Sequence, residues 1–256
     1  MSLVSFGGVT GHPRTPHRDT GGGGAPAGRP GTTASRRVAV GSVAEAEESI
    51  AAAARAGRAS AEFRADFPRG SDFVGRGDGV SPRVAGAYRR IRNSPEDTAR
   101  VGANTGIDTR VVEGMRRNLF VEQHDIAVGP DRVERGYFTP DEDIADLWDG
   151  AARGTLSPEK AAEFRNLAAH EYVENRLMAA GLPYRSAHPD SFDADGDHIL
   201  HPLHPGAHDL APNEWRPEAP LQHWRLFGLD SPGIQMAADL SNLDDVVGAA
   251  LRGLAR

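Results

Sequence analysis

Apolar side chains recur three and four positions apart through most of the chain after residue 84, a spacing that predicts α-helices. The expected helix ends carry capping signals: Ser, Thr or Asp, often with proline, at the starts, and Gly at the stops. The starts are expected at Ser94-Pro95, Asp108, Thr139-Pro140, Ser157-Pro158 and Ser241, and the stops at Gly106, Gly154 and Gly181. No segment shows a convincing strand pattern, so the predicted fold class is mostly α.

The first third of the chain lacks this periodic pattern. Residues 1–36 are rich in Gly, Pro and Arg and offer almost nothing to bury, which predicts disorder. Residues 37–83 combine an Ala- and Glu-rich segment, predicted to form one helix over 42–66, with a Gly/Pro/Asp/Arg linker over 68–82. The sequence therefore predicts a disordered leader, a helix with a linker, and a compact α-helical domain over residues 84–256.

The helix expected between Ser157 and Gly181 carries ionisable groups on its apolar stripe. At about 100° per residue, Glu171 and Glu174 fall on the same face as the apolar side chains, with His170 at its edge. A buried carboxylate must be paired, protonated or bound to a metal, because its burial is otherwise too costly. This placement predicts a site, or a buried His–Glu pair that only orients a neighbouring loop.

The spacing of these residues is that of a metal-binding helix. His170 and Glu174 are i, i+4 neighbours that project to one point, as the two histidines of a zincin helix do around the intervening glutamate. Here the pattern is His-Glu-x-x-Glu, which makes Glu171 the candidate general base and His170 and Glu174 candidate ligands of Zn²⁺, Mn²⁺ or Mg²⁺.

A third ligand is expected from the loop after this helix. Residues 183–235 form a long stretch rich in Pro, His and Asp, too rich in reactive side chains to be only a linker. We expect His188 to complete the catalytic group, and His208 and Asp209 to be further metal ligands.

Composition and charge narrow the chemistry. The chain has no Cys, which excludes disulfides, thiolate zinc sites and cysteine nucleophiles. Residues 93–256 hold 15 basic and 28 acidic side chains, so their surface does not attract nucleic acid passively, and an anionic substrate would need a divalent metal nearby. No apolar run or classical signal peptide occurs, which predicts no membrane insertion, and a location in the cytoplasm of the producer or export by another route.

A series of short motifs runs from Ile91 to His188. They are Ile91–Ser94 with Asp97, Thr105–Gly106, Asn118–Phe120 with His124, Phe138–Asp141 with Ile144 and Trp148, His170–Glu171 with Glu174, Leu177–Met178, Gly181, and Tyr184 with His188. In order and spacing these motifs resemble the C-terminal toxin-like domains of bacterial polymorphic toxins, which also occur fused to phage head-morphogenesis proteins. The resemblance covers residues 88–190.

The resemblance implies effector or toxin cargo, often regarded as a nuclease, with an immunity protein as a partner. It also implies site roles for His170, Glu171, Glu174, His188 and His124. Such domains often have a basic residue just before the His-Glu pair, and this chain has Ala169 there.

Three functions are consistent with the sequence. The first is an effector-type, metal-dependent hydrolase of nucleic acid, and the second is a metallopeptidase, which needs a third ligand from the loop but no basic surface. The third is a non-enzymatic phage or secretion-system module with a structural His/Glu network. An open cleft beside Glu171 would favour an enzyme, and a closed network would favour the structural module.

Overall fold

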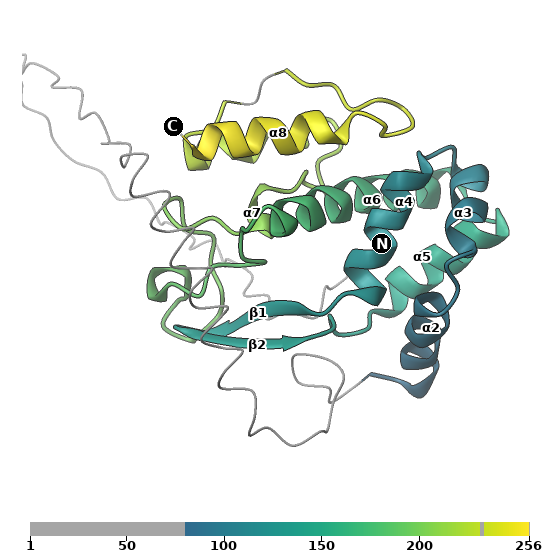
Figure 1. Cartoon of the computed structure of the whole chain (residues 1–256), viewed down its shortest axis with the longest axis horizontal. Coiled ribbons are helices and arrows are strands. Elements are labelled where there is room, and N and C mark those ends of the chain that lie inside the picture. Colours follow the sequence, from purple (N-terminus) through teal and green to yellow (C-terminus); the bar gives the residue numbers. More distant parts are fainter. Residues whose placement is uncertain (1–79, 231–232, 256) are drawn as a thin grey trace, which may run out of the picture.

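The computed structural model describes residues 80–230 and 233–255, which form a mostly α-helical fold (Figure 1). This confirms the predicted fold class. The main helices are α2 (Pro82–Arg92), α3 (Asp97–Thr105), α4 (Thr109–Arg116), α5 (Glu142–Arg153), α6 (Pro158–Ala179) and α8 (Leu243–Leu254). The predicted leader over 1–36 and the predicted helix over 42–66 lie outside the described residues. Helix α2 begins two residues before the predicted domain start at 84, inside the expected linker.

Most of the predicted caps are present. The side chains of Asp108, Asp141 and Ser157 accept backbone hydrogen bonds at the starts of α4, α5 and α6. Gly106 and Gly154 end α3 and α5 with left-handed backbone, φ 71° and 67°. Helix α6 likewise ends at Ala179, just before Gly181.

Three predicted starts are displaced. Helix α5 begins at Glu142 after the capping residue Asp141, and not at the expected Thr139-Pro140. Helix α3 begins at Asp97 because Ser94–Glu96 form a turn in which the Asp97 amide donates to the Ser94 carbonyl oxygen at 3.1 Å. Helix α8 begins at Leu243 after Asn242, and the Ser241 side chain does not cap it.

A β-hairpin corrects the expectation that the chain has no strand. Strands β1 (His124–Gly129) and β2 (Arg132–Gly136) pair antiparallel and lie below α6 and α7 in the view of Figure 1. Both strands are short and mostly half-buried or exposed, so they lack the long alternation of apolar and polar residues that indicates a strand from sequence.

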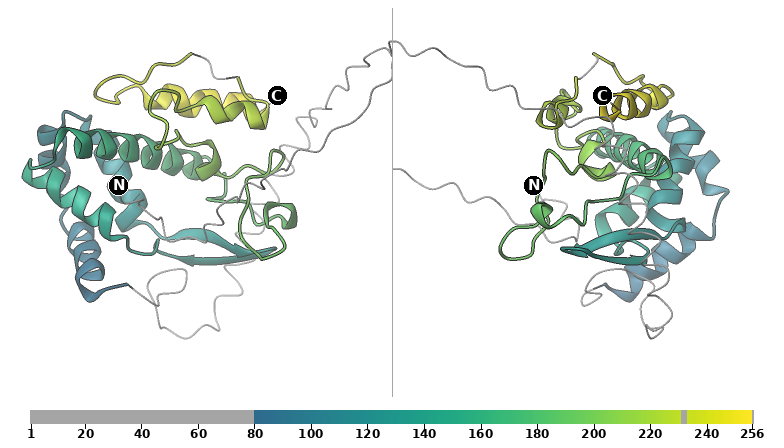
Figure 2. Two further views of the ribbon diagram at one scale, coloured as in Figure 1. Left: turned by 180° about the vertical axis from the view of Figure 1, so that it is seen from behind. Right: turned by 60° about the vertical axis from the view of Figure 1, so that its left-hand side comes forward.

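Helix α6 is the central element. Helix α8 lies along one side of it, while α4, α5 and the hairpin lie on the other (Figures 1 and 2). Its middle is therefore buried all round and not only on one stripe, as ten residues show: Phe164, Leu167, Ala168, Ala169, His170, Glu171, Tyr172, Val173, Glu174 and Leu177. A helix that is enclosed in this way places any polar side chain at its centre inside the protein.

The chain after α6 returns to this helix through short helical turns. These are η3 (Pro189–Ser191), α7 (Ala207–Leu210) and η4 (Gln222–Phe227), within the stretch predicted as a long loop. Trp224 in η4 donates its indole hydrogen to the Leu210 carbonyl oxygen at 2.9 Å, which ties η4 to α7. None of the helices in the described parts of the chain combines the length and apolar character needed to cross a membrane.

Candidate metal centre

Three ionisable residues in the middle of α6 are buried, as their position in the sequence predicted. His170, Glu171 and Glu174 expose 5%, 4% and 1% of their surface. They lie on successive turns at the middle of the helix, where α4, α7 and α8 enclose it. Each of these groups must therefore find a partner inside the protein.

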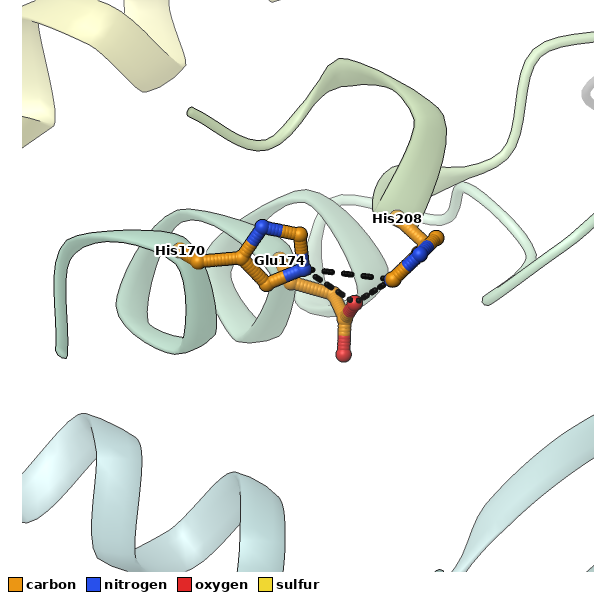
Figure 3. A group of neighbouring side chains, drawn as sticks. All are labelled: His170, Glu174 and His208. Atoms are coloured by element: carbon orange, nitrogen blue, oxygen red, sulfur yellow. Dashed lines mark hydrogen bonds and ion pairs between the residues drawn. The ribbon is translucent and has the colours of Figure 1, made fainter. Parts of the chain in front are cut away.

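Helix α7 brings His208 to the two ligands expected on α6 (Figure 3). His208 Nδ1 lies 2.8 Å from Glu174 Oε2 and 3.1 Å from His170 Nε2, and the last two atoms are 3.3 Å apart. A tetrahedral Zn²⁺ with bonds of about 2.0–2.1 Å holds its ligand atoms about 3.3 Å apart. The triangle of two imidazole nitrogens and one carboxylate oxygen therefore has nearly the dimensions of one face of such a site.

The tautomer of His170 fits metal binding. Its Nδ1 donates to the Pro212 carbonyl oxygen at 2.9 Å, since a carbonyl oxygen can only accept. In the neutral ring the lone pair is then on Nε2, which points at Glu174 and His208. Metal-ligating histidines usually make this second hydrogen bond, which sets the ring orientation and the tautomer.

Backbone contacts hold α7 in place against the end of α6. The amides of Ala207 and His208 donate to the carbonyl oxygens of Pro183 and Tyr184 at 2.8 and 3.0 Å. Gly206 makes this approach possible, because a Cβ there would lie 2.4 Å from the Tyr184 carbonyl oxygen. The position of His208 thus depends on backbone packing one residue before α7.

Electrostatics favour a charged histidine next to a charged carboxylate in the metal-free protein. Burial alone lowers the pKa of His170, but the hydrogen bond to Glu174 and the charges of Glu214, Glu174 and Glu171 outweigh burial and raise it to about 10. Burial likewise tends to raise the pKa of Glu174, yet its hydrogen bonds with His170 and His208 bring this pKa below its usual range. Burial and then the charge of Arg185 lower the pKa of His208 to about 4.

Glu171 is in a different state from Glu174. Burial, followed by the charge of Glu174, raises the pKa of Glu171 well above its usual range. The pKa values of these two carboxyl groups, on adjacent turns of one helix, are shifted in opposite directions. Glu174 therefore remains ionised, while Glu171 takes a proton more readily.

Asn118 joins the two carboxyl groups. Its Nδ2 donates to Glu171 Oε2 at 2.7 Å and to Glu174 Oε1 at 2.8 Å, and its side chain is fully buried. Asn118 lies in η2 (Arg117–Val121), a π-helical turn that continues α4. Such turns are rare and frequently occur at functional sites.

Not every residue predicted for the site belongs to the triangle. Asp209 accepts a hydrogen bond from the Gly206 amide at 2.8 Å and so caps α7. His188 lies at the surface with Asp190 and His204, its ring stacked on His204 at 3.6 Å, in a second group that could hold a metal. His124 donates to the backbone oxygen of Asn118 at 2.8 Å and stacks on Phe138, so it contacts the site indirectly.

Two residues that orient the side chains of the site were not predicted from the sequence. Asn118 was noted only within a short motif, and Pro212, whose carbonyl oxygen orients His170, was not singled out. The role of Asn118 depends on the π-helical turn and that of Pro212 on the path of the loop, so no local pattern marks either residue.

The triangle reaches solvent on one side only. A quarter of the His208 side chain is exposed, against 7% for His170 and 2% for Glu174. Two hollows, of about 400 and 300 Å³, lie near α6 but are lined by none of the three ligand residues. Solvent or an ion would therefore reach the three ligand atoms from the side of His208.

Comparisons with known protein families, characterised proteins and solved structures give no match to this chain. The resemblance to toxin-like domains therefore stays a prediction, and the geometry of the metal centre is what bears on function.

Proposed function

We propose that this protein is a divalent-metal-dependent hydrolase whose metal is held by His170, Glu174 and His208. The observation that supports it most is the triangle of ligand atoms, with sides of 2.8, 3.1 and 3.3 Å. Two imidazoles and one carboxylate are the protein ligands found in several catalytic zinc sites, where a fourth position stays open. Zn²⁺ is the metal that this mixed nitrogen and oxygen ligand set suits best.

Glu171 is the proposed general base. It follows His170 directly, as the base follows the first ligand in a zincin helix, and burial, followed by the charge of Glu174, raises its pKa well above the usual range, which makes it a stronger base. Asn118 keeps its carboxyl group beside Glu174. The metal would supply a polarised water, and the residues of the chain would orient it and take its proton.

The substrate bond that we infer is a peptide bond. A single centre with two histidine ligands resembles peptidase sites, whereas two-metal phosphodiesterases hold a pair of ions about 3.5–4 Å apart. The excess of acidic side chains over residues 93–256, 28 against 15 basic, also opposes binding of nucleic acid. An effector role remains part of the proposal through the resemblance to toxin-like domains.

The test uses the purified full-length chain with Zn²⁺ or Mn²⁺ and three substrates: unfolded protein, RNA and single-stranded DNA. We expect cleavage of the protein substrate only, loss of cleavage with a chelator, and a loss of about 100-fold or more in Glu171→Gln. The zinc content of Glu171→Gln should be unchanged. Cleavage of RNA or DNA alone would show that the substrate is a nucleic acid and not a protein. Cleavage of none of the three substrates would overturn the proposed hydrolase activity. Growth arrest on induced expression, relieved by His170→Ala, would support the effector role.

A structural polar network is the second candidate, and the closure of the site favours it. Here His170, Glu171 and Glu174, each at most 5% exposed, would hold the loop on α6 without turnover. A network of this kind would give no hydrolysis, and removing one charged partner would cost about 3–5 kcal/mol in unfolding free energy. Activity of the wild-type chain with zinc would exclude it.

A further inference from the structure

A hollow of about 300 Å³ lies between α5, α6 and residues 214–215. Leu167, on its α6 wall, is just under one turn before the metal ligand His170, and one turn advances about 5.4 Å. Glu214, on another wall, is two residues after Pro212, which holds the His170 ring. A group that enters the hollow therefore lies next to the metal centre.

The hollow combines an apolar floor with a half-buried carboxylate. Ile144 and Leu147 line its α5 side together with Leu167. Glu214 lines it as well, and among the described residues its carboxylate has neither a hydrogen bond nor an ion pair. Burial raises the pKa of Glu214, and the charge of His170 lowers it only in part, so a cation in the hollow would further stabilise this carboxylate.

The other acids at the hollow add to this negative charge. Glu163 pairs with Lys160 at 2.7 Å, which neutralises it, whereas Glu159 forms no ion pair with any residue that the structure describes. The carboxylates of Glu159 and Glu214 therefore border a space that has no basic residue in its described lining.

Trp215 supplies an aromatic wall. More than half of its surface, 56%, is exposed, although a large aromatic side chain gains most from burial. The face of an indole ring attracts ammonium and guanidinium groups, and arginine also stacks on it.

We propose that this hollow is a subsite for the side chain of an arginine or lysine next to the bond that is cleaved. The aliphatic part of that side chain would pack on Leu147 and Leu167, and its charged end would reach Glu214 beneath Trp215. This inference rests on the proposed peptidase function for its place in turnover, while the cation site itself is independent of the metal.

The test compares a hexapeptide that contains one arginine with the same peptide containing citrulline, the neutral counterpart of arginine. Binding to the full-length chain is measured by calorimetry in the presence of a chelator, so that no cleavage occurs. We expect the arginine peptide to bind at least about tenfold more tightly, and Glu214→Gln to remove this preference. Glu218→Gln, at an exposed acid four residues further on, is the matched control and should keep it.

Equal binding of the two peptides, or a preference that survives Glu214→Gln, would overturn the subsite. Circular dichroism and the melting temperature of Glu214→Gln, both expected to be those of the wild type, show that the fold is intact. Because this binding is measured without metal, a result that overturns the subsite does not affect the proposed hydrolase activity, which the cleavage assay tests separately. If the protein prefers the arginine peptide but cleaves no peptide, the cation site is supported and the proposed peptidase function is overturned.

Discussion

His170 donates its Nδ1 hydrogen to Pro212, and this contact determines what its Nε2 atom can bind. The Nε2 atom faces Glu174 and His208, and it holds either a proton or a metal. Since the pKa of His170 is raised to about 10, the proton is present at neutral pH when no metal is bound. Zinc and this proton must therefore compete for one atom.

Zinc affinity should rise with pH because of that competition. His208 is already neutral and Glu174 already ionised at neutral pH, so His170 alone releases a proton on binding. We expect the association constant to increase about tenfold per pH unit between pH 6.5 and 9. Calorimetry in buffers of different ionisation enthalpy measures the released proton, and an affinity that does not change with pH would contradict this assignment.

Asn118 should contribute more to stability than a surface asparagine that also donates two hydrogen bonds. Asn118→Leu removes two buried donors to carboxyl groups, which we expect to cost about 3 kcal/mol or more in unfolding free energy measured with urea. Asn104→Leu is the control, since Asn104 donates twice to the carbonyl oxygens of Ala151 and Ala152 nearer the surface. Asn104→Leu should lower the unfolding free energy by about 1 kcal/mol. An equal loss in the two variants would show that the carboxyl pair of Glu171 and Glu174 does not need Asn118.

At the residue scale the sequence predicted the buried groups better than their partners. A histidine and two glutamates on an apolar stripe indicated His170, Glu171 and Glu174 without knowledge of the fold. His208 was one of several loop residues proposed as completing groups, together with His188 and Asp209. Which of them meets α6 depends on the path of residues 180–206 between α6 and α7, and no local pattern encodes that path.

At the scale of elements, α7 is too short to be stable alone. It has four residues, and isolated helices shorter than about 12 residues are marginal in water. Its position comes from the backbone hydrogen bonds to Pro183 and Tyr184 and from the Trp224 contact with Leu210. The third ligand is thus held by packing outside its own helix.

Gly206→Ala should therefore weaken zinc binding without altering a ligand. The added Cβ would lie 2.4 Å from the Tyr184 carbonyl oxygen and 2.6 Å from the Arg185 Cα atom, so α7 must shift and carry His208 with it. We expect an affinity loss of about tenfold or more, as for other changes that misplace ligands. Gly86→Ala in α2, where a Cβ meets nothing within 4 Å, is the control and should bind zinc like the wild type.

Helices were predictable where capping residues and apolar spacing agree, as at Asp108, Asp141 and Ser157. The hairpin was not, because β2 (Arg132–Gly136) is largely exposed and reads as a polar segment. The π-helical turn η2 was not predicted either: it continues α4, and it is defined by a backbone hydrogen bond from the Glu122 amide to the Arg117 carbonyl oxygen, five residues before it. Local signals thus located the helices but not the turns that support the site.

At the scale of the whole molecule, the described core and the His170, Glu174 and His208 group lie together in one helical fold. The predicted domain start at residue 84 would remove Ser81 and Pro82, which begin α2, and Val80, which packs against the core. The functional unit should accordingly begin before residue 80.

Removing residues 1–78 should leave the fold and the zinc affinity unchanged. We expect the melting temperature of the shortened chain to stay within about 2 °C of the full chain, a change of under about 1 kcal/mol for a domain of this size. Calorimetry with and without zinc measures both quantities. A shortened chain that fails to fold would show that the first third of the sequence contributes to the core.

The central claim, a metal centre made by α6 and α7, is tested most directly by zinc binding to three full-length proteins: wild type, His208→Ala and His188→Ala. We expect one tightly bound zinc per wild-type chain at the buried centre. The zinc affinity should fall by at least about 100-fold in His208→Ala and stay at the wild-type value in His188→Ala. The two histidines lie in the same loop and differ in the cluster they join. Equal affinities in wild type and His208→Ala would contradict the account, since His208 is the only ligand that α7 supplies to the described triangle.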